Sequence, residues 1–274
     1  MVSIYRISNT LRKFIGLTNI FESNLLDKLE FNGNSNKVFV YIVNLNNCKL
    51  LIPQFWECLS AEERSKANKY YTSNLSDLYI ISHGILRCIL SYYTKQLPQE
   101  IEFIHNKYGK PFLKNHNFQF NISHSNDIVN YIIALDHKVG IDIEAHNNTL
   151  DIQEFSDLVF TPAEREFFTI LEAKERLEFF YNLWTKKESL IKACGQGLSY
   201  PLNTIEAMTL SSGEKIFLDK EDNKFKQEWY YFPLEVVSNY SGAIAIEHRI
   251  NQIIYLEMNY QRNVFDKIRS KWFN

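Results

Sequence analysis

The sequence predicts an α+β protein made of two similar halves, each with helices packed on a three-stranded, mainly antiparallel sheet. Helical periodicity followed by three strand-like segments occurs twice, which favours a duplicated unit. The 274 residues suffice for two small domains, and 45% hydrophobic with 23% charged residues is typical of a globular protein. The predicted parts are an N-terminal extension at 1–36, an N-terminal half at 37–138, a C-terminal half at 139–250, and a C-terminal strand and helix extension at 251–274.

The N-terminal half begins with a strand predicted over Val38–Val43 by its β-branched and aromatic residues. The capping-box pattern of Ser60–Glu63 starts a helix that we expect to reach about residue 71. Apolar residues three and four apart over 78–92 predict a buried helix, which ends near Pro98. Three strands are expected next, at 101–105, 118–123 and 129–135.

The C-terminal half repeats this order, starting with a strand over Val139–Glu144. A second capping box in Thr161–Glu164, with proline at the first helical position, starts helical segments that continue to Cys194. Gly195 and Gly197 then end the last helix. Further strands are expected at 204–210, 229–237 and 243–248.

Charge and cysteine usage exclude several classes of protein. A net charge of -2 and a pI near 6.4 lack the broad basic footprint of a nucleic-acid-binding protein. Four cysteines, at 48, 58, 88 and 194, are too scattered for a zinc or redox motif and predict reduced thiols. No apolar run approaches the ~18 residues of a membrane span. We therefore expect a soluble, cytoplasmic protein without nucleic-acid or membrane partners.

The N-terminal extension has basic residues but no acidic residue before Glu22. A secretory signal is disfavoured because the longest apolar stretch is short and interrupted. An organelle-targeting peptide and an extra helix packed on the domain both fit this composition.

Two carboxylates of one predicted strand share a face. Because successive side chains of a strand alternate, Asp142 and Glu144 project together while Ile141 and Ile143 face the core. Such a pair is repulsive unless a cation lies between the two groups. The alternative is a solvated edge strand whose charges deter pairing with other sheets.

On the last helix, Glu188 and Lys192 are four residues apart, one turn above each other. An ordinary surface ion pair explains this spacing, but a third carboxylate beside a lysine also completes a site for a metal and a phosphate. Magnesium prefers carboxylate, water and phosphate oxygens, and lysine binds phosphate as a point charge.

Lys110 and His124 each allow two interpretations. Lys110 lies between a glycine and a proline, which could aim it at a phosphate or form a plain hairpin turn. His124 lies between two serines at a strand end, where it could bind a ligand or serve as a hydrogen-bonded structural histidine.

Taken together, these segments resemble the 4'-phosphopantetheinyl transferases of the surfactin-synthetase-activating type over about residues 37 to 250. The matching motifs, in order, are Gly-Lys-Pro with Lys110, Phe-Asn-Ile-Ser-His-Ser with Ser123 and His124, Gly-Ile-Asp-Ile-Glu with Asp142 and Glu144, and Trp-Thr-Lys-Lys-Glu-Ser-Leu-Ile-Lys with Glu188 and Lys192.

This resemblance implies a pseudo-dimer with coenzyme A in the cleft between the halves. It also implies transfer of the phosphopantetheine arm of coenzyme A to a serine of an acyl or peptidyl carrier protein, with release of adenosine 3',5'-bisphosphate. The implied magnesium ligands are Asp142, Glu144 and Glu188, and the implied coenzyme A contacts are Lys66, Lys110, Ser123, His124 and Lys192. The attacking hydroxyl then belongs to the carrier protein, and positioning and charge stabilisation supply the catalysis.

Within this resemblance Glu188 and Lys192 are the catalytic candidates. Glu188 is the candidate for relaying the serine proton, although another of the three carboxylates could do so, and Lys192 would neutralise the phosphates. Some relatives carry basic residues where this chain has Glu63 and Leu78, so either its grip on the 3'-phosphate is weaker or Arg64 and Lys69 substitute. A monomer is expected because the two halves already form an internal dimer. A binding module without turnover and a magnesium-dependent transferase with another diphosphate donor are the alternatives.

Overall fold

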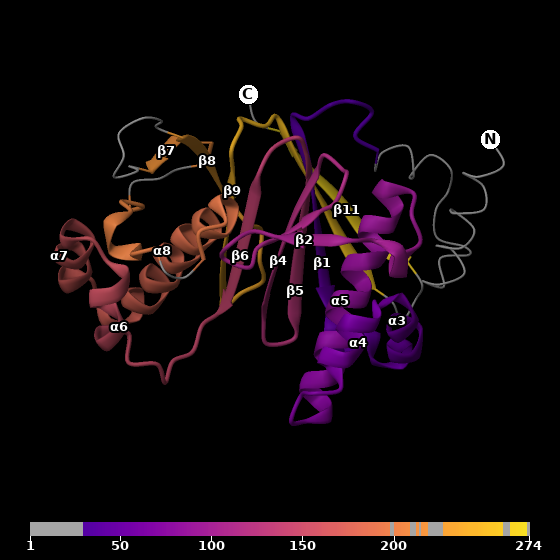
Figure 1. Cartoon of the computed structure of the whole chain (residues 1–274). Coiled ribbons are helices and arrows are strands. Elements are labelled where there is room, and N and C mark those ends of the chain that lie inside the picture. The colour runs from indigo at the N-terminus through magenta and orange to yellow at the C-terminus, as the bar shows by residue number, and fades with distance from the viewer. Residues whose placement is uncertain are drawn as a thin grey trace.

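The computed structural model describes residues 30–197, 200–208, 212–213, 215–218, 227–259 and 264–272, so most of the predicted N-terminal extension lies outside the described part. Figure 1 shows the arrangement of the elements. Their bounds are β1 Lys37–Asn44, η3 Leu45–Leu51, α3 Ile52–Cys58, α4 Ala61–Ala67, α5 Ser73–Thr94, η4 Pro98–Glu100, β2 Phe103–His105, β3 Pro111–Leu113, β4 Phe118–Ser125, β5 Ile128–Leu135, β6 Val139–Ala145, α6 Ile152–Val159, α7 Pro162–Ile170, α8 Ala173–Cys194, η5 Leu202–Thr204, β7 Lys215–Leu218, β8 Gln227–Pro233, β9 Tyr240–Ile246, β10 Gln252–Asn259 and β11 Val264–Trp272.

The predicted α+β class is confirmed, but the prediction of three strands in each sheet is wrong. The described strands form a five-stranded sheet in the order β11-β10-β1-β5-β4, a four-stranded sheet in the order β6-β9-β8-β7, and a small hairpin of β2 and β3. Only the pairing of β1 with β10 is parallel, so both larger sheets are mainly antiparallel. The N-terminal sheet is larger than predicted because β10 and β11 join it from the other end of the chain.

Two segments differ from their predicted secondary structure. The C-terminal extension was predicted to end in a helix, but Val264–Trp272 is strand β11, paired with β10. The strand predicted over 204–210 is also wrong in its described part, because a short 3-10 helix at Leu202–Thr204 follows Pro201 and a loop continues from it. Residues 209 and 210 lie outside the described residues. The pseudo-dimer and the four domain boundaries stay predictions.

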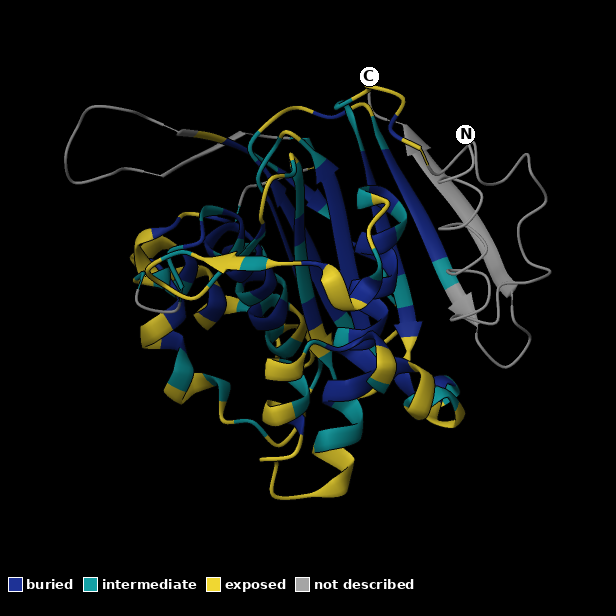
Figure 2. Cartoon of the chain, turned by 45° about the vertical axis from the view of Figure 1, so that its right-hand side comes forward, coloured by how far each residue is buried: buried dark blue, intermediate teal, exposed yellow. Residues whose placement is uncertain are grey.

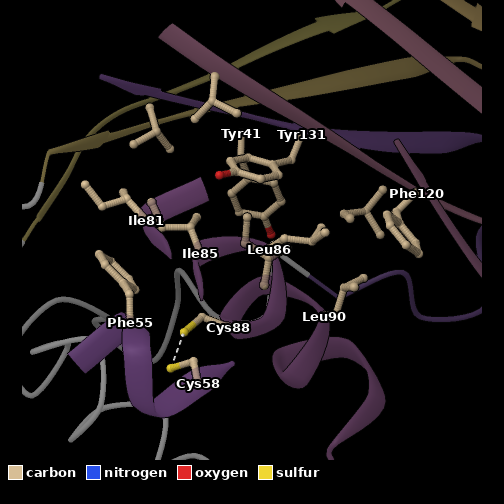
Figure 3. Packing of buried hydrophobic residues seen from close by; sticks show 14 of the residues in the cluster. Tyr41, Phe55, Cys58, Ile81, Ile85, Leu86, Cys88, Leu90, Phe120 and Tyr131 are labelled. Carbon is tan, nitrogen blue, oxygen red and sulfur yellow. Dashed lines mark hydrogen bonds between the residues drawn. The ribbon is translucent and has the colours of Figure 1, made fainter. Parts of the chain in front are cut away.

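The first core lies between the N-terminal helices and one face of the five-stranded sheet. Phe39, Tyr41 and Val43 alternate along β1 toward this face and pack against α3 and α5. Figure 3 shows this packing, including the buried thiols of Cys58 and Cys88, whose sulfur atoms lie 3.4 Å apart in a hydrogen bond. The four cysteines are free thiols, as predicted.

The second core lies between the two larger sheets. Val38 and Val40 of β1 point to the opposite face and pack with Ile141 and Ile143 of β6. Because both faces of β1 are covered, its sequence is a nearly continuous apolar run. Figure 2 shows the resulting buried interior of the central strands. Helix α8 covers the far face of the four-stranded sheet through Leu190, and the described molecule is therefore layered helix, sheet, sheet, helix.

The helix termini follow the predicted chemistry. Ser60 accepts a hydrogen bond from the Glu63 amide at 3.2 Å, and the Glu63 carboxylate accepts one from the Ser60 amide at 3.0 Å. The same reciprocal pair caps α7. Gly195 ends α8 with a φ of 69°, which glycine adopts without strain. Within the described ranges, no helix has both the length and the apolar character needed to cross a membrane.

Candidate active site

The two sheets meet along a seam between β4 and β6. Strand β6 is an edge of its own sheet, and side chains of β4 satisfy the backbone amides on its free side. These hydrogen bonds run from the amides of Ile141, Ile143 and Ala145 to Asn121 Oδ1 at 2.9 Å, Ser123 Oγ at 3.3 Å and Ser125 Oγ at 2.9 Å. The Asn-Ile-Ser-His-Ser motif therefore places one polar side chain opposite every second residue of β6.

Asp142 lies at the centre of this seam and is 1% exposed. Its Oδ1 accepts hydrogen bonds from Lys192 Nζ at 2.6 Å and from Ser123 Oγ at 2.9 Å. Its Oδ2 is buried and has no hydrogen-bond partner among the residues that the structure describes. Burial raises the pKa of this carboxyl, and the lysine and the serine oppose that rise.

Glu144 lies two residues further along β6 and projects on the same side, as the strand alternation predicted. Ser125 Oγ donates a hydrogen bond to its Oε2 at 3.0 Å. Burial and then repulsion by Asp142 raise the pKa of Glu144. Each carboxylate of β6 thus has a serine of β4 beside it, and the two carboxylates disfavour each other's ionised form.

Helix α8 brings the third carboxylate because it lies directly against β6. A Cβ on Gly140 would come within 1.9 Å of the Ser189 carbonyl oxygen and 2.4 Å of the Ala193 amide nitrogen. Only glycine permits so close an approach of strand and helix. Glu188 and Lys192 immediately precede these two helical residues, so the close approach sets how they face Asp142.

Glu188 is 4% exposed, and its Oε1 is buried without a hydrogen-bond partner. Its pKa is raised to about 7, first by burial and then by repulsion from Asp142, while Lys192 lowers it. A carboxyl with this pKa exchanges protons near neutral pH, as a general base or acid requires.

The trio of Asp142, Glu144 and Glu188 has the chemistry of a cation site. All three pKa values are raised, two of the three carboxylates have a buried oxygen without a partner, and hard divalent cations prefer such oxygens. Among the residues with described positions, no three acidic, histidine or cysteine side chains are arranged to hold a metal ion as they stand. The ammonium of Lys192 contacts Asp142 Oδ1 at 2.6 Å.

Lys110 reaches the same two elements from the N-terminal half. Its Nζ donates to the Val139 carbonyl at 3.0 Å, where β6 begins, and to the Ala193 carbonyl at 2.9 Å, near the end of α8. Burial lowers its pKa to about 8. The turn that carries it is ordered by Asn106, whose side chain accepts the Lys110 amide at 2.9 Å. Lys110 therefore ties the turn between β2 and β3 to β6 and α8.

The other two residues predicted to bind coenzyme A lie less centrally. His124 follows Ser123 on β4, and its side chain is exposed by surface area. Partial desolvation by neighbouring groups and then Lys192 lower its pKa, while Asp142 raises it. Lys66 lies on α4, exposed, with its Nζ 5.2 Å from the centre of the Tyr79 ring. The structure therefore brings Ser123, Asp142 and Lys192 into direct contact and leaves Lys66 in the N-terminal half.

One ion pair beside the site was not predicted. Lys187 and Glu164 are both 0% exposed, and Lys187 Nζ donates to the Glu164 carboxylate and to the Val159 carbonyl. The other oxygen of Glu164 accepts the Ala207 amide at 2.9 Å. Since Lys187 precedes Glu188, this buried pair anchors the helix turn that carries the third carboxylate. The sequence signal was Glu164 itself, which was assigned only to a helix cap.

These features fit the class of enzymes that transfer a phosphate-containing group, because carboxylates and a lysine meet at a seam between two sheets. Family models agree: the 4'-phosphopantetheinyl transferase superfamily matches residues 138–245, and the N-terminal region of 4'-phosphopantetheinyl transferases matches residues 50–135.

Several relatives carry the same name. The 4'-phosphopantetheinyl transferase Sfp of Bacillus subtilis is 29% identical over 198 residues, which cover 71% of this chain and 85% of Sfp. Another 4'-phosphopantetheinyl transferase from Bacillus subtilis is 32% identical over 158 residues, covering 57% of this chain and 68% of that protein. HetI of Nostoc sp. is 28% identical over 169 residues, covering 60% and 71%.

A solved holo-[acyl-carrier-protein] synthase of Thermotoga maritima shares 18% identity, with a TM-score of 0.28 over 43% of this chain and 66% of that one, and adds nothing to the fold described above. The sequence matches are sufficient: this chain belongs to the 4'-phosphopantetheinyl transferase superfamily. The family predicted from the four motifs is confirmed.

Proposed function

We propose that Asp142, Glu144 and Glu188 hold a magnesium ion for the reaction of this family. That reaction transfers the 4'-phosphopantetheine arm of coenzyme A to a serine of an apo carrier protein and releases adenosine 3',5'-bisphosphate. The observation that carries the proposal is the convergence of three carboxylates and Lys192 where β6, β4 and α8 meet. When bound, magnesium would offset the negative charge of the diphosphate and of the three carboxylates.

In the proposed reaction, the carrier serine oxygen attacks the β-phosphorus. A phosphorus–oxygen bond to the serine forms, and the bond from that phosphorus to the bridging oxygen of the diphosphate breaks. Glu188 takes the serine proton, because its buried Oε1 has no hydrogen-bond partner among the described residues and can accept one. Lys192 faces the leaving adenosine bisphosphate and offsets its developing charge.

Coenzyme A is proposed to contact Lys66, Lys110, Ser123, His124 and Lys192. Lys110 can do so without leaving the seam, because an ammonium has three hydrogens and its two carbonyl partners use only two. Ser123 is the residue that connects the two halves of the site, since it contacts both Asp142 and Lys192. A monomer in the cytoplasm, without nucleic-acid or membrane partners, completes the proposal.

The test is transfer itself. The protein is incubated with coenzyme A, magnesium and a panel of apo acyl and peptidyl carrier proteins, and intact mass is measured with and without a chelator. The expected result is a carrier that gains the arm only when magnesium is present. A folded enzyme that modifies no carrier would contradict the family activity, and transfer that persists in chelator would contradict the metal.

A further inference from the structure

Acidic side chains outnumber basic ones around Asp142. Three carboxylates lie at the seam, and Lys192 is in contact with one of them: its Nζ is 2.6 Å from Asp142 Oδ1 and 2.9 Å from Ser123 Oγ. Ser123 donates its own hydrogen to the same Oδ1. Two donors therefore share one oxygen of Asp142 while its second oxygen has no partner.

This arrangement conflicts with a magnesium ion on the same carboxylate. Magnesium takes oxygen ligands at about 2.0–2.1 Å and demands near-octahedral geometry. An ammonium in contact with a ligand oxygen repels a second cation at close range, strongly so in a buried site. Lys192 thus occupies Oδ1 of Asp142, and a cation on the other oxygen of this carboxylate would lie close to the ammonium.

Lys192 is free to leave, unlike its partner Asp142. Its side chain is 30% exposed, whereas that of Asp142 is 2% exposed. The ammonium can move outward without leaving a positive charge buried and unpaired, provided that an anion binds it. A diphosphate is such an anion, since charge-assisted hydrogen bonds to phosphate are strong.

We propose that Lys192 is a displaceable counter-ion, which neutralises Asp142 in the free enzyme and moves to the diphosphate of coenzyme A as magnesium takes over the carboxylate. The inference rests on the proposed function and adds a consequence to it. Coenzyme A removes the competitor of the metal, and the metal frees the lysine for coenzyme A. The two bind with positive cooperativity, and the coupling is equal in both directions.

The experiment measures metal affinity, with no carrier protein present and hence no turnover. Mn²⁺ is titrated into the protein and followed by electron paramagnetic resonance, without and with saturating coenzyme A. The variants are Lys192→Met, which removes the counter-ion, and Lys192→Arg, which keeps it. Lys192→Gln is the second neutral variant in case the methionine variant does not fold.

Lys174→Met is the matched control. Lys174 lies on the same helix, but about 27 Å from position 192 along it, with a side chain 77% exposed and paired with Glu172. The Lys174→Met variant removes the same charge as Lys192→Met but leaves the site unchanged.

Without coenzyme A, Lys192→Met is expected to bind Mn²⁺ about tenfold more tightly than the parent protein, and Lys192→Arg and Lys174→Met within about twofold of it. Adding coenzyme A should tighten Mn²⁺ binding in the parent, and this gain should shrink about tenfold in Lys192→Met. Equal Mn²⁺ affinities of the parent and both neutral variants would overturn the inference. If the parent then still transfers the arm with magnesium, only the counter-ion role fails; a parent that neither binds Mn²⁺ nor transfers the arm contradicts the proposed function as well.

Discussion

The backbone of Gly140 on β6 lies so close to that of Ala193 on α8 that an added Cβ would be 2.4 Å from the Ala193 amide nitrogen. The neighbouring obstacle, the Ser189 carbonyl oxygen, is also backbone. Neither can rotate away as a side chain would. The approach of helix to strand therefore sets where the third carboxylate and the lysine of the site lie.

Gly140→Ala is expected to lower the free energy of unfolding by about 1–3 kcal/mol or more, because it overpacks this contact. It should also slow arm transfer strongly, since α8 must shift away from β6. Denaturant unfolding and the intact-mass assay check both effects. The double variant with Ala193→Gly should not recover, because the clash is with backbone; full recovery would show that the Ala193 methyl group was the obstacle.

Asp142→Asn should reduce the transfer rate by about 100-fold to 1,000-fold, the loss typical of removing one electrostatic contact in an active site. Little stability should be lost, since Asn keeps the size of Asp and Lys192 can turn to solvent. Initial rates and melting temperature are the measurements. Asp136→Asn, in the exposed turn before β6, is the control and should change neither. Retained activity with a large drop in melting temperature would make Asp142 a structural residue.

Metal binding should release protons near pH 6.5, because Glu188 must ionise to bind a cation and its pKa in the free enzyme is about 7. Calorimetry in two buffers of different ionisation enthalpy measures the release, and Glu188→Gln should reduce it. Identical apparent heats in both buffers would contradict the assignment.

The same pKa predicts how the stability of the metal-free fold depends on pH. A carboxyl whose pKa is raised above its usual 4.5 stabilises the fold below pH 4.5, and this contribution is lost as the pH rises through about 7.

Lys110→Met should lower both stability and coenzyme A affinity. Two backbone carbonyls lose a charged donor, which costs about 1.5–3 kcal/mol for hydrogen bonds of this kind. Chemical denaturation and calorimetric titration with coenzyme A measure the two effects, and Lys114→Met, in an exposed ion pair, serves as control. A loss of stability with unchanged coenzyme A affinity would leave Lys110 as a connector of the halves alone.

Lys187→Met should destabilise the fold by about 3–5 kcal/mol, because it leaves the Glu164 carboxylate buried without its cation. The double variant Lys187→Met/Glu164→Gln removes both charges and should be more stable than the single variant. Unfolding in urea compares the two. An additive loss in the double variant would mean that the two side chains do not stabilise each other.

The sequence predicted those parts of the fold that depend on local chemistry. Strand-like composition located β4 and β5, alternation placed the side chains of β6, and the capping boxes at Ser60 and Thr161 located α4 and α7. It did not predict that β10 lies parallel to β1, because the pairing of Lys37 with Gln252 joins segments more than 200 residues apart and leaves no local signal. Composition alone also led to the wrong strand after Thr204.

For the site, the sequence located the acidic residues but not their surroundings. Spacing placed Asp142 and Glu144 on one face, as the structure has them. Ser125 donates a hydrogen bond to Glu144, and Asn121 accepts one from an amide of β6. Both contacts depend on how the two sheets meet, which the periodicity of a single strand does not predict. Nothing in the sequence indicated that Lys187 is buried. Lysines are almost always exposed unless they are paired, and its partner Glu164 is distant in the sequence.

Because β10 pairs with β1, the five-stranded sheet is incomplete without residues from the C-terminal part of the chain. A chain cut at residue 250 keeps every proposed site residue, yet it loses two strands of the N-terminal sheet and bares the backbone edge of β1. An apolar edge of this kind is a template for intermolecular pairing. During synthesis, the five-stranded sheet can be completed only after β10 and β11 have left the ribosome.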